Sequence, residues 1–132
     1  MSDLSGSVKA AILAHLDASA LVTAIVPPAR IFAMQPTADP GRPFIRYGIP
    51  TVQPFEDSCG RGVLMTVPLH AFAQSEPQAQ QLAAALQEAM EGLAPTSLRL
   101  IACDWERTTF LHEEAEADLW HAHVSFSLTA TA

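Results

Sequence analysis

Charged residues are scarce in this 132-residue chain, at 16% of the total, whereas about a quarter is usual in soluble domains. Lysine occurs once, as Lys9. Fourteen acidic residues against seven basic ones leave a net charge of -7. This balance excludes the clustered lysine and arginine surface that broad nucleic-acid binding requires.

Cysteine is also rare. The chain has only Cys59 and Cys103, and these two do not form a CxxC pair. A disulfide framework is therefore excluded, and we expect unreactive thiols in a reducing compartment. No apolar run reaches the ~18 residues of a membrane span, and the N-terminus has no signal-peptide pattern. We expect a protein that is made in the cytoplasm and has no membrane partner.

Motifs that bind nucleotides or catalyse hydrolysis are also missing, since the sequence has no P-loop, GxGxxG, HExxH or GxSxG. Cys59 lies in a Ser-Cys-Gly stretch, but no histidine stands at a position that would activate it. The sequence thus predicts neither an enzyme nor a bound cofactor.

The charge that is present lies in the second half of the chain. Residues 1–66 hold five acidic and five basic residues, whereas residues 67–132 hold nine acidic and two basic ones. Most of this excess falls between Asp104 and Asp118. An acidic stretch beside apolar strands is typical of a solvated loop.

The first 28 residues have the pattern of a helical arm. Apolar residues recur at helical spacing on one face and lead to a second short helical segment, which the Pro27-Pro28 pair ends. The apolar positions of the two segments are Leu4, Val8, Ala11, Ile12, Leu16, Leu21, Val22 and Ile25.

Residues 30–74 change to a strand pattern. Two short apolar runs, 31–34 and 44–47, flank a loop rich in proline and glycine. Residues 50–62 have the composition of a long, poorly ordered connection. Residues 62–74 alternate as a long strand, and Pro68 within it predicts an edge position or a bulge.

The second half predicts a helix followed by a hairpin. Ser75 is a typical N-cap for a helix over residues 76–91, which Gly92 ends. Alternating residues 98–110 and 119–130 predict two antiparallel strands joined by an acidic tip. We therefore expect one α+β domain over residues 1–132: an antiparallel sheet within residues 30–132, a long helix on one face and a helical arm at residues 1–28.

The histidines near the acidic tip suggest a metal site as one alternative. His112, His121 and His123 lie close in sequence to glutamates that could complete such a site. In the other interpretation, His121 and His123 lie on the polar face of a strand and pair with Asp104 or Glu106.

The order of several stretches resembles one family of proteins. These stretches are Val8 to Leu16, Arg30-Ile31-Phe32, Pro43 to Gly48, Ala71 to Ser75, Ala79 to Leu86 and Asp118 to Phe126. They resemble the tail completion or tail terminator proteins of long-tailed phages, prophages and gene transfer agents. The individual motifs are loose, so the resemblance depends on their order along nearly the whole chain.

The resemblance implies a structural virion protein without catalytic residues. It implies a homohexameric ring at the head-proximal end of the tail, bound to the tail tube protein and to a head-completion or neck protein. DNA would pass through this ring without specific binding. Alternatives are a head-tail stopper or neck connector, and a small adaptor or antitoxin-like module of a mobile element.

Two polar segments are our candidate contacts with neighbouring subunits or partners, because loops that order on assembly commonly regulate association. If the acidic tip lined the ring, its charge would repel passing DNA phosphates. Turned outward, it would instead meet a basic partner surface. The candidate contact residues are Gln53, Pro54, Phe55, Glu56, Asp57, Arg61, His112, Glu113, Glu114, Glu116 and Asp118.

Overall fold

The computed structural model describes residues 4–57, 60–113 and 119–131. The helical segments that come first are α1 (Leu4–Ala18), α2 (Ala20–Thr23) and the 3-10 turn η1 (Pro28–Arg30). The strands that follow are β1 (Ile31–Phe32), β2 (Phe44–Tyr47), β3 (Thr51–Asp57) and β4 (Gly60–Ala73). The long helix α3 (Glu76–Glu91) then precedes β5 (Arg99–Glu113) and β6 (Leu119–Thr131). This architecture confirms the predicted α+β class.

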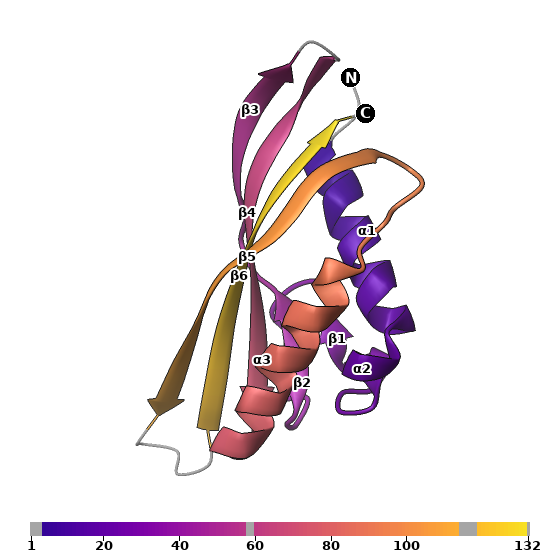
Figure 1. The fold of residues 1–132 in the computed structure, drawn as a ribbon. Coiled ribbons are helices and arrows are strands. Elements are labelled where there is room, and N and C mark those ends of the chain that lie inside the picture. The colour runs from indigo at the N-terminus through magenta and orange to yellow at the C-terminus, as the bar shows by residue number, and fades with distance from the viewer. Residues whose placement is uncertain (1–3, 58–59, 114–118, 132) are drawn as a thin grey trace.

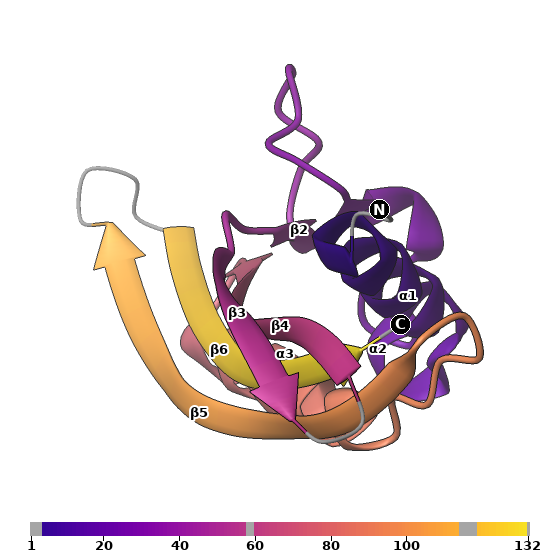
Figure 2. The ribbon, with the colours of Figure 1, turned by 90° about the horizontal axis from the view of Figure 1, so that it is seen from above.

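The described strands form one six-stranded sheet in the order β1-β2-β4-β6-β5, and β3 pairs with β4. β1 and β2 run parallel, because residues 33–43 cross back to the same end of the sheet, so the sheet is mixed. The remaining pairs are antiparallel, as predicted. The sheet is strongly curved, and the β3–β4 and β5–β6 hairpins extend from its opposite ends (Figures 1 and 2).

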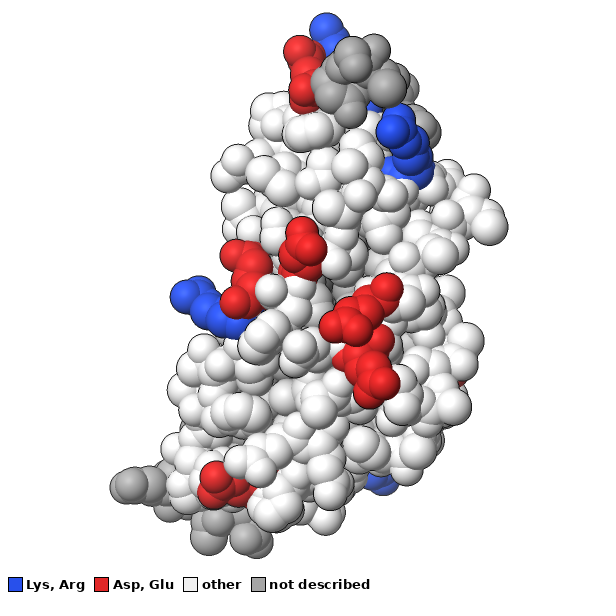
Figure 3. Space-filling view, viewed as in Figure 1, with Lys and Arg blue, Asp and Glu red and all other residues white. Residues whose placement is uncertain are grey.

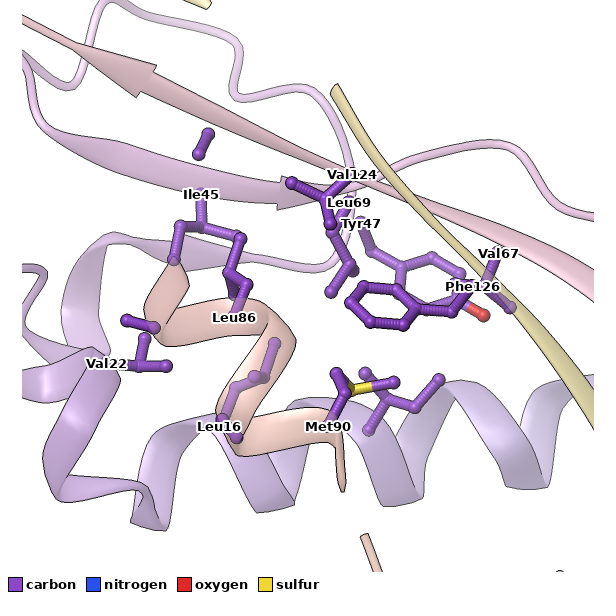
Figure 4. Close-up of a cluster of buried hydrophobic side chains, with 14 of the residues drawn as sticks. Leu16, Val22, Ile45, Tyr47, Val67, Leu69, Leu86, Met90, Val124 and Phe126 are labelled. Atoms are coloured by element: carbon purple, nitrogen blue, oxygen red, sulfur yellow. The ribbon is translucent and has the colours of Figure 1, made fainter. Parts of the chain in front are cut away.

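Helices α1, α2 and α3 lie on the same side of the sheet and bury one of its faces (Figure 1). Each valine, leucine, isoleucine, phenylalanine or methionine side chain that is fully buried in this core stabilises the fold by about 1.5–3 kcal/mol. The predicted arm is part of the same core, because its apolar side chains pack with those of α3 and the sheet (Figure 4). Fully buried members include Ile12, Leu16 and Val22 from the arm, Leu82 and Leu86 from α3, and Val67, Leu69, Val124 and Phe126 from the strands.

Helix α3 has the predicted bounds, 76–91. The Ser75 side chain accepts a hydrogen bond from the Gln78 backbone N–H at 3.3 Å, as an N-cap does. The Gln78 side chain in turn accepts from the Gln74 backbone N–H at 2.9 Å, one residue before the usual capping-box partner. At the other end, His15 Nε2 lies 2.6 Å from the Ala89 carbonyl oxygen and joins α1 to α3.

Pro68 does not lie on an edge strand, so the edge alternative of that prediction was wrong. It lies in β4, which pairs with β6 on one side and with β2 and β3 on the other. The β2 partners of β4 are residues 69–72 and the β3 partners begin at Thr66, so Pro68 faces the junction between the two strands. There its carbonyl accepts from Gly48 N–H at 2.8 Å, and a proline is tolerated because no ladder partner faces its nitrogen.

For the described residues, the prediction of a poorly ordered connection over residues 50–62 was also wrong. Residues 51–57 form β3 and pair in continuous register with β4, from Thr51 opposite Thr66 to Asp57 opposite Gly60. The glycine and charge that suggested a loop instead suit a hairpin exposed on both faces.

Candidate interaction surfaces

The β3–β4 hairpin contains the first group of predicted contact residues. Gln53 and Pro54 are exposed and Phe55 is half-buried, because the helices do not cover this part of the sheet (Figure 1). Pro54 pairs opposite Val63 and contributes no backbone donor, a common feature of edge strands. The hairpin therefore presents both side-chain faces and one strand edge for contact with a neighbour.

An ion pair lies near the tip of this hairpin. Arg61 Nε is 3.0 Å from Glu56 Oε1, and their side chains are 85% and 68% exposed. Water screens such a pair, so it contributes little to folding. Both groups remain accessible to a partner. Asp57, the third charged residue predicted here, ends β3 opposite Gly60.

The second predicted group lies at the end of β5. His112 is exposed and stacks on Trp120 with ring centroids 4.2 Å apart. Glu113 is the last residue of β5 and pairs with Leu119. Glu114, Glu116 and Asp118 lie outside the described residues.

The structure does not bring His112, His121 and His123 together. His112 pairs opposite Trp120, whereas His121 pairs opposite Leu111, so period-2 alternation places His112 on the other face of the sheet. In residues 4–57, 60–113 and 119–131, no group of three or more His, Cys, Asp or Glu residues could hold a metal ion. The metal alternative is therefore wrong for the described histidines.

The alternative pairing of these histidines with acidic residues was also wrong. Asp104 lies opposite Ser127, four residues beyond His123, and a register shift follows Trp105. The partner of His121 is instead His70 of β4, whose Nδ1 lies 2.8 Å from His121 Nε2. His123 packs against the same ring, with centroids 4.7 Å apart.

These three half-buried imidazoles form a cluster on the sheet face opposite the helices, and we call it the histidine cluster. Burial, with smaller effects of the Arg46 charge and of neighbouring histidines, lowers the pKa of both His70 and His121 to about 4. Burial, then Arg107 and Arg46, lowers the pKa of His123. The cluster is therefore uncharged at neutral pH.

Aromatic rings continue this cluster across the sheet. Phe44 stacks on Phe72 at a centroid distance of 4.5 Å, and Phe72 stacks on His121 at 4.4 Å. The Arg46 guanidinium lies 5.7 Å from the Phe72 ring centroid. Cross-strand stacking of this kind stabilises neighbouring strands. The row thus fixes the register of β2, β4 and β6.

Strand β5 has an exposed apolar surface that the sequence reasoning missed. Trp105, Phe110 and Leu111 are 46%, 44% and 48% exposed along this edge strand. Trp105 and Phe110 lie opposite Phe126 and Ala122 on the helix-bearing face, yet simple alternation would separate them. The bulge after Trp105 adds one residue to the strand and so places the Trp105 and Phe110 side chains on the same face. The only sequence signal for this surface was that the strand predicted over residues 98–110 carries apolar residues on both of its faces.

The remaining chemistry of the described residues is not that of a catalytic site. Burial, with a smaller effect of Asp104, raises the pKa of the Cys103 thiol to about 11, so the thiol is protonated and unreactive at neutral pH. Cys59, the other cysteine, lies outside the described residues.

Over the described part of the chain, none of the helices has the length and apolarity needed to cross a membrane.

Comparison with known proteins gives one family. The model of the family described as "Tail completion protein gp17" matches residues 10–130. No match was found among curated proteins.

Two solved structures share the fold. A chain of the virion of a native gene transfer agent particle superposes with a TM-score of 0.83 at 20% identity, and all of both chains is covered. The gp17 protein of bacteriophage SPP1 gives a TM-score of 0.63 at 18% identity, over 95% of this chain and 89% of that one. At such identities the likeness establishes the fold alone.

Proposed function

This chain belongs to the tail completion protein gp17 family, and from that membership we propose that it forms a ring that terminates the tail tube. The family makes it a structural protein of the phage tail and not an enzyme. In the proposal, the ring is a homohexamer at the head-proximal end of the tail. It stops growth of the tube and provides the surface to which the neck of the filled head binds.

The observation that carries this proposal is the family match over residues 10–130, which includes almost every described element. The surface agrees with it, because large uncharged areas suit a chain that contacts several neighbours (Figure 3). In a closed ring each subunit uses two different surfaces, since each contact is head-to-tail.

In this assembly the β3–β4 hairpin is the proposed contact with the tube or the neck. It extends from one end of the sheet and exposes Gln53, Pro54, Glu56 and Arg61 (Figure 1). The net charge of -7 suits a ring through which DNA passes without being bound, because like charges repel.

The direct experiment adds this chain to tail tube protein during polymerisation and measures tube length by electron microscopy. The proposal predicts shorter tubes with extra density at one end. Tubes of unchanged length and bare ends would contradict it.

A head-tail stopper or neck connector is the second candidate, because the fold itself does not choose a partner. Pull-down of the purified chain with tube protein and, separately, with the protein adjacent to the portal distinguishes the two. Retention by the tube protein supports a terminator, whereas retention only by the portal-adjacent protein supports a stopper.

A further inference from the structure

The two edges of the described sheet have opposite charge. One edge consists of β1, β2 and residues 33–43 between them, and we call it the arginine edge. With the preceding turn η1, this segment contains Arg30, Arg42 and Arg46 against a single acidic residue, Asp39. Arg30 and Arg42 are both partly exposed.

The opposite edge is strand β5, and helix α3 covers the adjoining helix-bearing face of the sheet; we call these two elements the acidic edge. Their exposed acidic side chains include Glu88, Glu91, Asp104 and Glu106, beside the exposed Arg99 and Arg107 of β5. Helix α3 has three acidic residues and no basic one, and β5 has three acidic and two basic ones. Figure 3 shows acidic side chains on this face together with a few basic ones, and most of the surface between them is uncharged.

Both edges also expose apolar side chains. Met34 is 69% exposed on the arginine edge, and Trp105 and Phe110 are 46% and 44% exposed on the acidic edge. An aromatic residue with a charged rim is the usual composition of a protein contact. A tryptophan and a phenylalanine left this exposed at an edge strand have no role in the core of the single chain.

We propose that the acidic edge of one subunit binds the arginine edge of the next copy of this chain. The sheet order β1-β2-β4-β6-β5 places the two edges on opposite sides of the subunit, as a head-to-tail contact requires (Figure 2). Opposite charges select this orientation over contacts between like edges, which would bring arginine against arginine or carboxylate against carboxylate. The inference rests on the proposed ring and names the surfaces that close it.

Charge reversal tests this contact. The acidic-edge variant D104K/E106K and the arginine-edge variant R30E/R42E are compared with the full wild-type chain by sedimentation velocity in low and high salt. Each variant is expected to weaken association by about tenfold or more at low salt, and raising the salt concentration weakens the wild type. Mixing the two variants pairs lysine with glutamate and restores association to within about threefold of the wild type.

The control D17K adds a lysine away from both edges, and the single variant D104K is its match on the acidic edge. Asp17 is an exposed residue of α1, and D17K is expected to associate as the wild type does. Thermal melting of every variant shows whether a loss of association reflects unfolding.

The outcomes separate this inference from the proposed ring. An associating wild type with unchanged edge variants, or variants not restored by mixing, would overturn the edge contact and leave the ring in place. A wild-type chain that stays monomeric at all concentrations, with and without tube protein, would overturn both.

Discussion

His70 Nδ1 lies 2.8 Å from His121 Nε2 across β4 and β6, and this contact holds two uncharged imidazoles together on the sheet face opposite the helices. Burial, more than the Arg46 charge, lowers the pKa of both rings from the usual 6.5 to about 4. The folded protein therefore favours the neutral form of both imidazoles, and the stability of the fold depends on pH.

Stability is expected to decline as the pH falls from about 6.5 to about 4. Above 6.5 both rings are neutral in the folded and unfolded chains, and their contribution is fully present. Below it the unfolded chain binds protons first, because the folded pKa of His70 and His121 is about 4. The melting temperature measured between pH 7.5 and 4 checks this.

The control for this pH dependence is H70Q/H121Q, which removes both titrating groups and keeps hydrogen-bonding side chains. Its melting temperature should change less steeply with pH than that of the wild type, whatever its absolute stability. Equal slopes in the two proteins would rule out the histidine pair as the cause.

Gly62 is expected to reject a side chain. An added Cβ at this position of β4 would collide with the Ala130 carbonyl oxygen of β6. Gly62→Ala should therefore cost about 1–3 kcal/mol, as overpacking does. Gly92→Ala is the matched control, because its Cβ would lie 3.6 Å from the nearest atom, an ordinary contact. Urea unfolding of both variants decides the point, and equal midpoints would contradict the account.

Two phenylalanines on the same sheet face should differ in what their removal changes. Phe126 is 1% exposed, so Phe126→Ala leaves a cavity and is expected to cost about 3–5 kcal/mol. Phe110 is 44% exposed, so Phe110→Ala should cost about 1 kcal/mol or less and weaken subunit association instead. Paired unfolding and sedimentation experiments measure both effects. A Phe110→Ala protein that is as unstable as Phe126→Ala would disagree with this assignment.

The N-cap of α3 gives a smaller, local prediction. Ser75→Ala removes the acceptor of the Gln78 N–H and is expected to cost about 1 kcal/mol. Ser75→Asp keeps an acceptor and should retain wild-type stability. Thermal unfolding of the two variants gives the comparison, and an Ala variant as stable as the Asp variant would be inconsistent with a working cap.

Local signals were sufficient to predict the helix and the long strands. The Ser75 cap, the Gly92 stop and the apolar spacing between them depend only on neighbours in sequence, so α3 has its predicted bounds. Alternation likewise predicted β6, in which Ala122, Val124 and Phe126 are buried.

Features that depend on strand pairing could not be predicted from the sequence. The parallel β1–β2 pair depends on how residues 33–43 cross between two runs that the sequence did predict as strands, whereas β3 forms by pairing with β4 although its composition resembles a loop. The bulge after Trp105 moves exposed aromatic side chains to one face, and alternation alone cannot place a bulge. His70 joins His121 because β4 and β6 are neighbours, a relationship between residues 51 positions apart.

The most direct test of the account is the number of copies of this chain in the ring that it forms, and the place of that ring on the tail tube. Native mass spectrometry should detect a homohexamer of 14.1-kDa chains, about 85 kDa, and electron microscopy should place one such ring at a single end of each tube. A chain that remains a 14.1-kDa monomer and leaves both ends of the tube bare would contradict the central claim.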